Sequence, residues 1–339
     1  MSLTKKEEKI LKSIVVGSEN NPDKPEFPPD APKFPATPTF QIEVPGFSNV
    51  WFKDESKNLT GTHKDRMAWE MVVTYKEFLR AKKAGRIESL PTLSILSSGS
   101  AALAIQTQLK NYQLPNLHVL MDSNTDPKIV RSLEKIWCNV FLKKLGSKIL
   151  TWEDILQYTN NENGFDINSN EAYDPTVRYY DRLSYEIINI DADCIFVPFG
   201  TGQLYENIMN IIKSELSYKR KDPRFKWTKK ILQNTSIFGA TTTNPKSKAD
   251  KLFAPFLPFA NFSKQRIRFY RYTGLTGSMS EVYNLQENYL EKAMSIALSQ
   301  WLDCEHSGIA WLWLLLQIEN KIPKDKKILI VNTGKTKLL

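Results

Sequence analysis

Short apolar runs, each followed by a stretch with helical spacing of its apolar residues, recur along most of this 339-residue chain. The run Thr92–Leu96 precedes a helical stretch at Ala101–Lys110, and the run Cys194–Val197 precedes one at Leu204–Lys213. Strands that alternate with helices in this way predict an α/β fold, with a mainly parallel sheet covered by helices on both faces. Further strands are expected at Val50–Phe52, Leu117–Met121, Val140–Leu142, Ser236–Ala240 and Ile328–Val331, and further helices at Lys64–Ala84, Pro127–Trp137, Glu287–Trp301 and Ser307–Gln317.

The composition is that of a globular protein, with 41% hydrophobic and 24% charged residues. Its length suits one large domain or two smaller ones. The three cysteines, Cys138, Cys194 and Cys304, are too few for a disulfide framework and show no C-x-x-C spacing. We therefore expect reduced thiols and a cytoplasmic protein. Apart from Cys304 and His306, no cysteine and histidine lie close together in the sequence, so we expect no metal site.

The sequence contains no segment that points to a membrane. The first residues contain no long apolar core, so no signal peptide is expected. The most apolar run, Ile309–Leu316, is far too short to span a bilayer.

The net charge is +9, from 46 basic and 37 acidic residues, which leaves nucleic acid, an anionic surface or a phosphorylated small molecule as possible partners. The densest basic run, Lys219–Lys230, is interrupted by Asp222, Pro223 and aromatic residues. It is more typical of a solvated loop and helix start than of a nucleic-acid stripe. We expect no nucleic-acid partner, and a basic nucleic-acid binder stays the alternative on net charge alone.

Prolines are concentrated between Pro22 and Pro45. Such a segment favours extended, polyproline-like backbone and excludes a helix. We interpret residues 1–45 as an N-terminal arm, Pro-rich from residue 22, that lies on the surface of the domain. A ligand for an SH3-type domain is the alternative.

Three loops next to expected helix starts carry residues suited to chemistry. In KNLTGTHKDR (Lys57–Arg66), Lys64 falls in the first helical turn, where the helix dipole disfavours the charged ammonium. Its neutral amine would then be available as a nucleophile or Schiff-base former, the alternative being an ordinary exposed lysine.

The second loop, SSGSAA (Ser97–Ala102), follows an expected strand, and its hydroxyls and amides can bind an anion such as a carboxylate. The third, GTGQ (Gly200–Gln203), follows the apolar run CIFVP and precedes a helix, which makes it a candidate phosphate site. It matches neither a Walker loop nor a G-x-G-x-x-G motif.

Together these segments resemble the fold-type II pyridoxal-phosphate enzymes, the group that contains threonine synthase, cysteine synthase, threonine dehydratase and tryptophan synthase β. The matching segments, in the family's order, are TPTF (Thr37–Phe40), WFKDESKNLTGTHKDR (Trp51–Arg66), SSGSAALA (Ser97–Ala104), VPFGTGQL (Val197–Leu204), EHSGIAW (Glu305–Trp311) and VNTGK (Val331–Lys335). The resemblance implies two domains with mainly parallel sheets. Residues 46–89 and 181–339 would form the larger, cofactor-binding domain, and residues 90–180 the smaller, mobile one.

The resemblance also implies roles for individual residues. Lys64 would form the Schiff base with pyridoxal 5′-phosphate, and Thr333 would face the pyridine nitrogen. The cofactor phosphate would be bound by Gly200, Thr201, Gly202, Gln203 and the amide of Leu204. Ser97, Ser98 and Gly99 would bind the substrate carboxylate. The sequence departs from the family at two positions, with Ser100 where asparagine usually contacts the cofactor's phenolic oxygen, and Gln203 where glycine is favoured.

The implied function is β-elimination or β-replacement on a small amino acid, with Lys64 removing the α-proton. The VNTGK ending resembles threonine synthase, which adds β,γ-replacement to the possible reactions of this lyase or synthase. A homodimer in amino-acid metabolism is expected, without membrane partners. Ser100 and Gln203 motivate the alternative, a non-catalytic pyridoxal-phosphate-binding relative with a regulatory or binding role.

Overall fold

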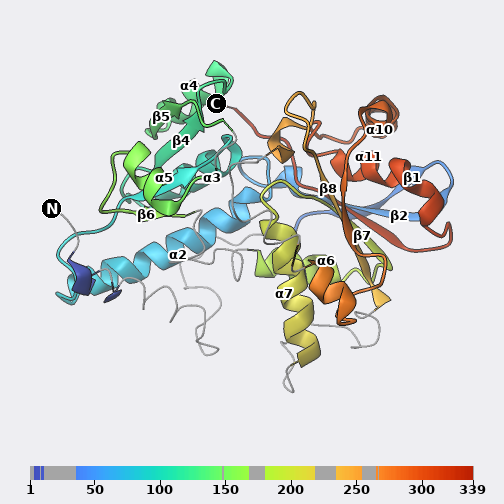
Figure 1. Ribbon diagram of the computed structural model, residues 1–339, viewed down its shortest axis with the longest axis horizontal. Helices are drawn as coiled ribbons and strands as arrows, with labels where there is room; N and C mark the ends of the chain where they lie inside the picture. The colour runs from blue at the N-terminus through green and yellow to red at the C-terminus, as the bar shows by residue number, and fades with distance from the viewer. Residues whose placement is uncertain are drawn as a thin grey trace. The chain divides into compact units, whose positions relative to one another are not determined.

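The computed structural model describes residues 4–7, 9–10, 36–146, 149–167, 180–217, 234–253, 265 and 267–338, which form two compact units. The first unit comprises Lys64–Tyr179 with the two ends of the chain, Met1–Ala36 and Leu338–Leu339. The second comprises Thr37–His63 and Tyr180–Lys337. Each unit has its own sheet (Figure 1). The predicted α/β fold with mainly parallel sheets is confirmed.

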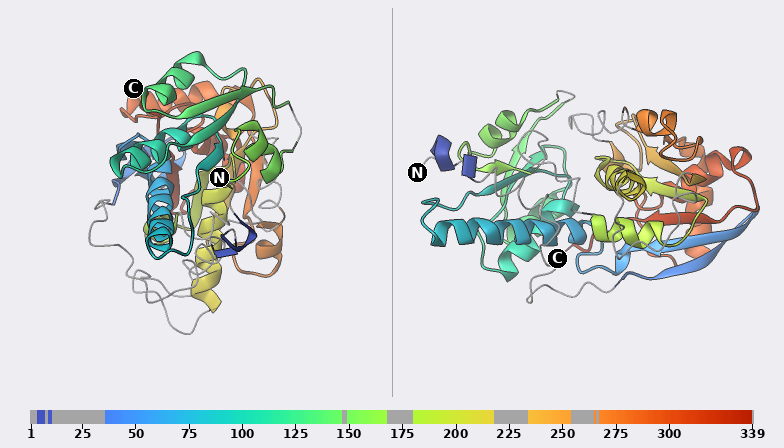
Figure 2. Two further views of the ribbon diagram at one scale, coloured as in Figure 1. Left: turned by 90° about the vertical axis from the view of Figure 1, so that its left-hand side faces the viewer. Right: turned by 90° about the horizontal axis from the view of Figure 1, so that it is seen from below.

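The first unit contains a parallel four-stranded sheet in the order β5-β4-β3-β6. Its strands are β3 (Leu93–Leu96), β4 (His118–Asp122), β5 (Asn139–Lys143) and β6 (Phe165–Asp166). Its helices are α2 (Lys64–Lys83), α3 (Ser100–Asn111), α4 (Pro127–Lys135) and α5 (Trp152–Tyr158). The long helix α2 packs along α3, as the views in Figure 2 show.

The second unit contains a six-stranded sheet in the order β1-β2-β10-β7-β8-β9. Its strands are β1 (Thr39–Val44), β2 (Phe47–Asp54), β7 (Cys194–Pro198), β8 (Ser236–Thr241), β9 (Glu281–Asn284) and β10 (Ile328–Asn332). Only the β1–β2 pair among these strands is antiparallel. Helices α6 (Asp181–Ile188), α7 (Gln203–Ser217), α10 (Leu290–Ser299) and α11 (Ala310–Gln317) pack around it, with 3₁₀ turns η1 (Glu55–Lys57), η2 (Asp250–Leu252), η3 (Glu287–Tyr289) and η4 (Glu319–Lys321).

Strand β10 shows why this sheet is covered on both faces. All five of its residues are buried, although neighbouring side chains in a strand point to opposite faces. Ile328 and Ile330 belong to the apolar core that contains α11, where Trp311 and Trp313 are fully buried. Leu329 and Val331 point to the other face and are equally buried, which is the pattern of a central parallel strand.

Strand β1 lies at the edge of the sheet and inside the segment that the sequence assigned to the N-terminal arm. The stretch Thr39–Val44 contains no proline, and Ile42 and Val44 alternate into the core, so it forms a strand instead of extended arm. Its outer edge is partly covered. The side-chain amide of Gln300 accepts a hydrogen bond from the Glu43 amide at 2.7 Å and donates one to the Glu43 carbonyl at 2.8 Å. The rest of the predicted arm, up to residue 35, lies almost wholly outside the described residues.

The predicted strands and helices are all present, with ends that differ by a few residues. One such difference is the predicted helix Glu287–Trp301. Its first residues form the 3₁₀ turn η3, and α10 ends at Ser299, because Trp301 adopts a left-handed conformation with φ of 57°. The two-residue strand β6 is not predicted from the sequence.

The two units divide the chain differently from the predicted domains, since residues 37–45 of the predicted arm group with the second unit. Residues 64–89 were assigned to the larger domain, whereas they group with the first unit, because α2 packs on α3. The mobility of the smaller domain stays a prediction. The basic run Lys219–Lys230 lies outside the described residues. All three cysteines are free, and no helix among the described residues is long and apolar enough to cross a membrane.

Candidate functional site

Three neighbouring strands of the second unit, β2, β10 and β7, run parallel to one another. Their carboxyl ends therefore lie at the same edge of the sheet, where α/β proteins bind ligands. The segments that follow are Asn58–His63 (the Lys64 loop), Thr333–Lys337 (the Thr333 loop) and Phe199–Gly202 (the Gly200 loop). The structure thus places Thr333 and the Gly200–Leu204 segment, both predicted from sequence, at one edge.

The Lys64 loop and the Thr333 loop are joined through their backbones. The Thr333 carbonyl accepts hydrogen bonds from the His63 amide at 3.1 Å and from His63 Nδ1 at 3.2 Å. The Lys335 amide donates to the Gly61 carbonyl at 2.8 Å. Because a carbonyl only accepts, His63 Nδ1 must carry a proton. The two loops therefore form one connected structure directly before Lys64 in the chain.

Glycine is required where these loops meet. Gly334 has φ of +105°, and a Cβ atom there would lie 2.1 Å from the Gly61 carbonyl oxygen. Gly61 has φ of +83°, and its Cβ would lie 2.2 Å from the Lys335 carbonyl oxygen. Both the backbone conformation and the close approach exclude a side chain at either position.

Lys64 is the first residue of α2 and is half-buried. Burial lowers the pKa of its ammonium to about 8, because desolvation disfavours the charged form. The sequence predicted a destabilised ammonium from the helix dipole, and the structure points to burial as the cause. An amine with this pKa is neutral often enough at pH 7 to attack a carbonyl carbon.

The Gly200 loop connects β7 to the start of α7. A Cβ at Gly200 would lie 2.8 Å from the Lys251 carbonyl oxygen, and Gly202 has φ of +82°. The loop is therefore a tight backbone turn that presents the first amides of α7, which lack acceptors within the helix. The Gln203 amide is 3.4 Å from the Thr201 hydroxyl, and the Gln203 side chain is buried. Such a turn is suited to an anionic group.

The Ser97–Ser100 loop belongs to the first unit, where it follows β3 and α3 begins at Ser100. Ser97 Oγ accepts hydrogen bonds from the Gly99 amide at 3.0 Å and the Ala102 amide at 3.4 Å. Gly99 has φ of +122°, and a Cβ there would lie 2.6 Å from Ile129 Cγ2. Ser98 is exposed. The loop is thus a turn that requires glycine at position 99, with Ser97 as its internal acceptor.

A buried charged cluster that contacts the Lys64 loop through Asn58 is not predicted from the sequence. Lys53 Nζ lies 2.6 Å from Glu186 Oε2 and 2.8 Å from the Thr37 carbonyl oxygen, and its side chain is almost inaccessible to solvent. Glu55, also buried, accepts hydrogen bonds from Asn58 and Thr37. The only sequence signal was a lysine and a glutamate two positions apart, before and after Asp54.

Tyr180 connects this cluster to His63. Its ring stacks on the His63 imidazole with centroids 5.3 Å apart. Burial raises the pKa of the Tyr180 hydroxyl well above its ordinary value, and the negative charge of the nearby Glu55 carboxylate raises it further. Tyr180 is therefore a neutral phenol at physiological pH, and its packing fixes the ring that precedes Lys64.

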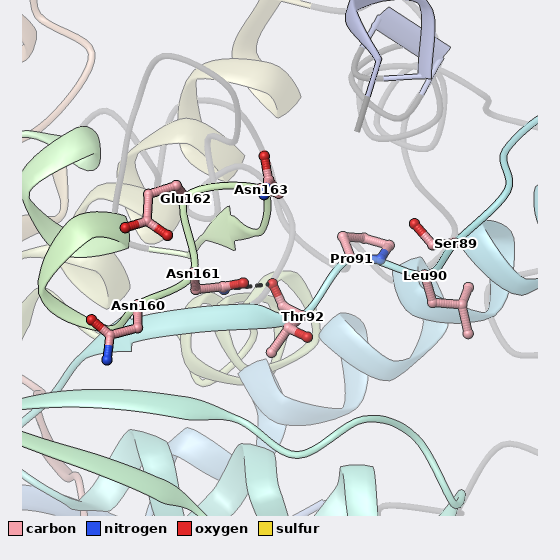
Figure 3. Close-up of a pocket in the computed structure, with 8 residues that line it drawn as sticks. All are labelled: Ser89, Leu90, Pro91, Thr92, Asn160, Asn161, Glu162 and Asn163. Atoms are coloured by element: carbon pink, nitrogen blue, oxygen red, sulfur yellow. Dashed lines mark hydrogen bonds between the residues drawn. The ribbon is translucent and has the colours of Figure 1, made fainter. Parts of the chain in front are cut away.

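A separate small pocket of about 190 Å³ lies in the first unit (Figure 3). It is lined by Ser89–Thr92 and Asn160–Asn163, and Asn161 Nδ2 donates to the Thr92 carbonyl at 3.0 Å. Thr92 directly precedes β3, so the pocket lies at the opposite end of that strand from Ser97. Within the described part of the chain, no group of acidic, histidine or cysteine side chains is arranged to bind a metal.

Comparison with known proteins agrees with this geometry. Residues 34–334 match the model of the family described as pyridoxal-phosphate dependent enzyme, and the chain belongs to that family. Its cofactor is pyridoxal 5′-phosphate. The turn at Gly200 and the low pKa of Lys64 fit this cofactor, which needs a site for a phosphate and an amine for an aldehyde. The search of curated proteins found no match.

Several solved structures share the fold. The O-acetyl serine sulfhydrylase isoform 3 from Entamoeba histolytica aligns with a TM-score of 0.63 and 15% identity over 94% of this chain and 91% of that one. Serine racemase from maize aligns with a TM-score of 0.59 and 16% identity over 85% and 83% of the two chains. The processed form of threonine deaminase isoform 2 from Solanum lycopersicum aligns with a TM-score of 0.60 and 14% identity over 86% and 80%.

Proposed function

We propose that this pyridoxal-phosphate-dependent enzyme catalyses β-elimination or β-replacement on a small amino acid, with Lys64 as the catalytic amine. The observation that carries the proposal is Lys64 itself. Its pKa is lowered to about 8 by burial, and it directly follows the His63 amide that is bonded to the Thr333 carbonyl. A lysine in this state serves both as a nucleophile toward an aldehyde and as a base.

The residues around Lys64 supply binding and orientation. The amides of the Gly200 loop and of Gln203 and Leu204 would bind the phosphate, and Thr333 would bind the pyridine nitrogen. Ser97, Ser98 and Gly99 would bind the substrate carboxylate, with Ser100 close to the phenolic oxygen. When bound, the cofactor supplies an electron sink for the bonds at the substrate's α-carbon.

The choice of reaction rests on Thr333. A hydroxyl is neutral and cannot keep a proton on the pyridine nitrogen as a carboxylate does. The electron sink is then weaker, which disfavours a long-lived carbanion and favours loss of a leaving group from the β-carbon. Structural relatives named as a sulfhydrylase and a deaminase support this choice, and β,γ-replacement of the threonine synthase kind is the narrower version of it.

A panel of amino acids, each added to the purified yellow protein, tests the proposal. We expect a spectral shift with a substrate that bears a leaving group on its β-carbon or γ-carbon, together with release of a keto acid or of a replacement product. Interconversion of enantiomers without either product would assign racemisation instead. A yellow protein that responds to no amino acid would support the non-catalytic relative, for which Ser100 and the buried Gln203 are the motivation. The homodimer and the cytoplasmic location stay predictions from sequence.

The low pKa of Lys64 predicts the pH dependence of cofactor capture. Because the pKa is lowered from 10.5 to about 8, the neutral amine accumulates as pH rises toward 8. About one Lys64 in ten is neutral at pH 7, against about three in ten thousand for an ordinary lysine. The rate at which the cofactor-free chain captures pyridoxal 5′-phosphate should rise about tenfold per pH unit below pH 8 and level off above it. Borohydride trapping followed by mass spectrometry measures this rate, and a rise that continues to pH 10 would contradict the assignment.

A further inference from the structure

Lys251, in the 3₁₀ turn η2 of the second unit, contacts several of the segments that surround the candidate site. Its ammonium lies 2.5 Å from Glu305 Oε2 and 2.9 Å from the Thr336 hydroxyl. Its amide donates to Ser307 Oγ at 3.2 Å. The side chain is only 19% exposed, so these contacts are largely shielded from water.

The backbone of the same residue supports the Gly200 loop. The Lys251 carbonyl oxygen lies 2.8 Å from the position that a Gly200 Cβ would occupy, and the Leu252 Cα lies 3.5 Å from it. The turn η2 therefore packs directly on the backbone of the Gly200 loop, with no room for a side chain between them.

These contacts complete a connection between two loops that must bind opposite ends of one molecule. Thr336 is part of the Thr333 loop, which is bonded to the Lys64 loop through Lys335 and His63. Lys251 thus joins the loop that precedes the reactive amine to the loop that presents the α7 amides. The length of the cofactor, from aldehyde to phosphate, sets the spacing at which both loops can bind it at once.

We propose that Lys251 is a positioning residue, which, through Glu305 and Thr336, keeps the Gly200 loop at the spacing that allows the phosphate and the aldehyde to be bound together. The inference rests on the proposed function of Lys64 and the Gly200 loop. It assigns Lys251 no contact with the cofactor, because the Lys251 ammonium is already bonded to Glu305 and Thr336.

The test compares pyridoxal 5′-phosphate with pyridoxal, which lacks the phosphate. The ratio of the affinity for pyridoxal 5′-phosphate to that for pyridoxal measures how much the phosphate adds to binding when the aldehyde is bound to Lys64. This addition depends on the spacing between the Lys64 loop and the Gly200 loop. The full-length chain, freed of cofactor, is titrated with each compound. In Lys251→Met we expect the ratio to fall on the order of tenfold, mostly through weaker binding of the phosphorylated compound. A variant that merely lost stability would weaken both compounds alike and leave the ratio unchanged.

Glu305→Gln separates positioning from direct contact. If Lys251 only positions the loop, weakening its ion pair with Glu305 should lower the ratio in the same direction as Lys251→Met. If the ammonium bound the phosphate itself, Glu305→Gln would leave the ratio unchanged or raise it, since a competing carboxylate would be gone. Lys326→Met is the matched control, because Lys326 forms a more exposed ion pair with Asp193, 3.4 Å long, before the amino end of β10. Its ratio should equal that of the unmodified chain.

The outcomes are distinct. An unchanged ratio in Lys251→Met overturns the positioning role, and so does an unchanged or raised ratio in Glu305→Gln. If the unmodified chain shows no preference for the phosphorylated compound, the proposed phosphate site fails, which is a separate result. Should Lys251→Met not fold, Thr336→Val, which removes one bond to the ammonium, and Glu305→Gln together decide the question.

Discussion

Replacing Lys64 by alanine is expected to abolish covalent attachment of pyridoxal 5′-phosphate while leaving the fold intact. The side chain of alanine has no amine to react with the aldehyde. The Lys64 loop, Asn58–His63, contains no lysine that could replace it. Loss of proton transfer by this group should lower activity by about 10²–10⁴-fold even with substrates that bind. Borohydride reduction, proteolysis and mass spectrometry of the peptide that contains residue 64 measure the attachment.

Stability supplies an independent readout for this variant. Burying an ammonium is costly, as the lowered pKa of Lys64 shows, so its removal should not destabilise the cofactor-free chain. Lys57→Ala is the matched control, since Lys57 lies at the start of the same sequence block and its side chain is 56% exposed. It should retain attachment and activity. Cofactor still trapped on the residue-64 peptide of Lys64→Ala would show that the amine lies elsewhere.

Gly334→Ala is expected to lower the free energy of unfolding strongly, because it adds a methyl group where the Thr333 loop meets the Lys64 loop. The left-handed backbone costs about 1–2 kcal/mol for a residue with a Cβ. The Cβ would also lie 2.1 Å from the Gly61 carbonyl oxygen, and the Gly61 backbone is fixed by its bond from Lys335. Overlap with backbone adds about 1–3 kcal/mol, for a total near 2–5 kcal/mol. Urea unfolding followed by circular dichroism should show a lower midpoint.

Gly274→Ala separates the two causes. Gly274 has φ of +67° in the same unit, and a Cβ there would meet no heavy atom within 4 Å. The free energy of unfolding of Gly274→Ala should therefore fall only by the cost of the left-handed backbone. Gly334→Ala should also bind pyridoxal 5′-phosphate less tightly, because the displaced Thr333 loop is bonded to His63, whereas Gly274→Ala should not. Equal midpoints for the two variants would contradict the close packing of Gly334 on Gly61.

Elements with long apolar periodicity could be predicted from sequence, and short or partly exposed ones could not. Helix α5 has seven residues and depends on a capping box between Thr151 and Asp154. Strand β9 is only half-buried, so its residues lack the apolar run that marked β7 and β10. Strand β1 was hidden by the prolines around it. In each case the neighbouring sheet or cap, not the local apolar pattern, decides the structure.

The candidate site was predictable where its residues are contiguous in sequence. The Lys64 block, the Gly200 loop and Thr333 each follow a strand, and the order of β2, β10 and β7 brings their ends to one edge. Lys251, Lys53 and Tyr180 were not found, because their importance lies in partners that are far away in sequence. Lys53 meets Glu186 only through the packing of α6, and no spacing rule links Lys251 to Glu305.

The Gln300 amide beside β1 has a consequence for self-association. The Gln300 carboxamide presents a carbonyl oxygen and an N–H side by side, as a residue of a paired antiparallel strand does, so at Glu43 it takes the place that a foreign strand would occupy. Open sheet edges are templates on which identical chains can stack into fibrils. At Glu43 the template is already filled by the protein's own side chain. Growth of an aggregate along β1 would first have to displace Gln300.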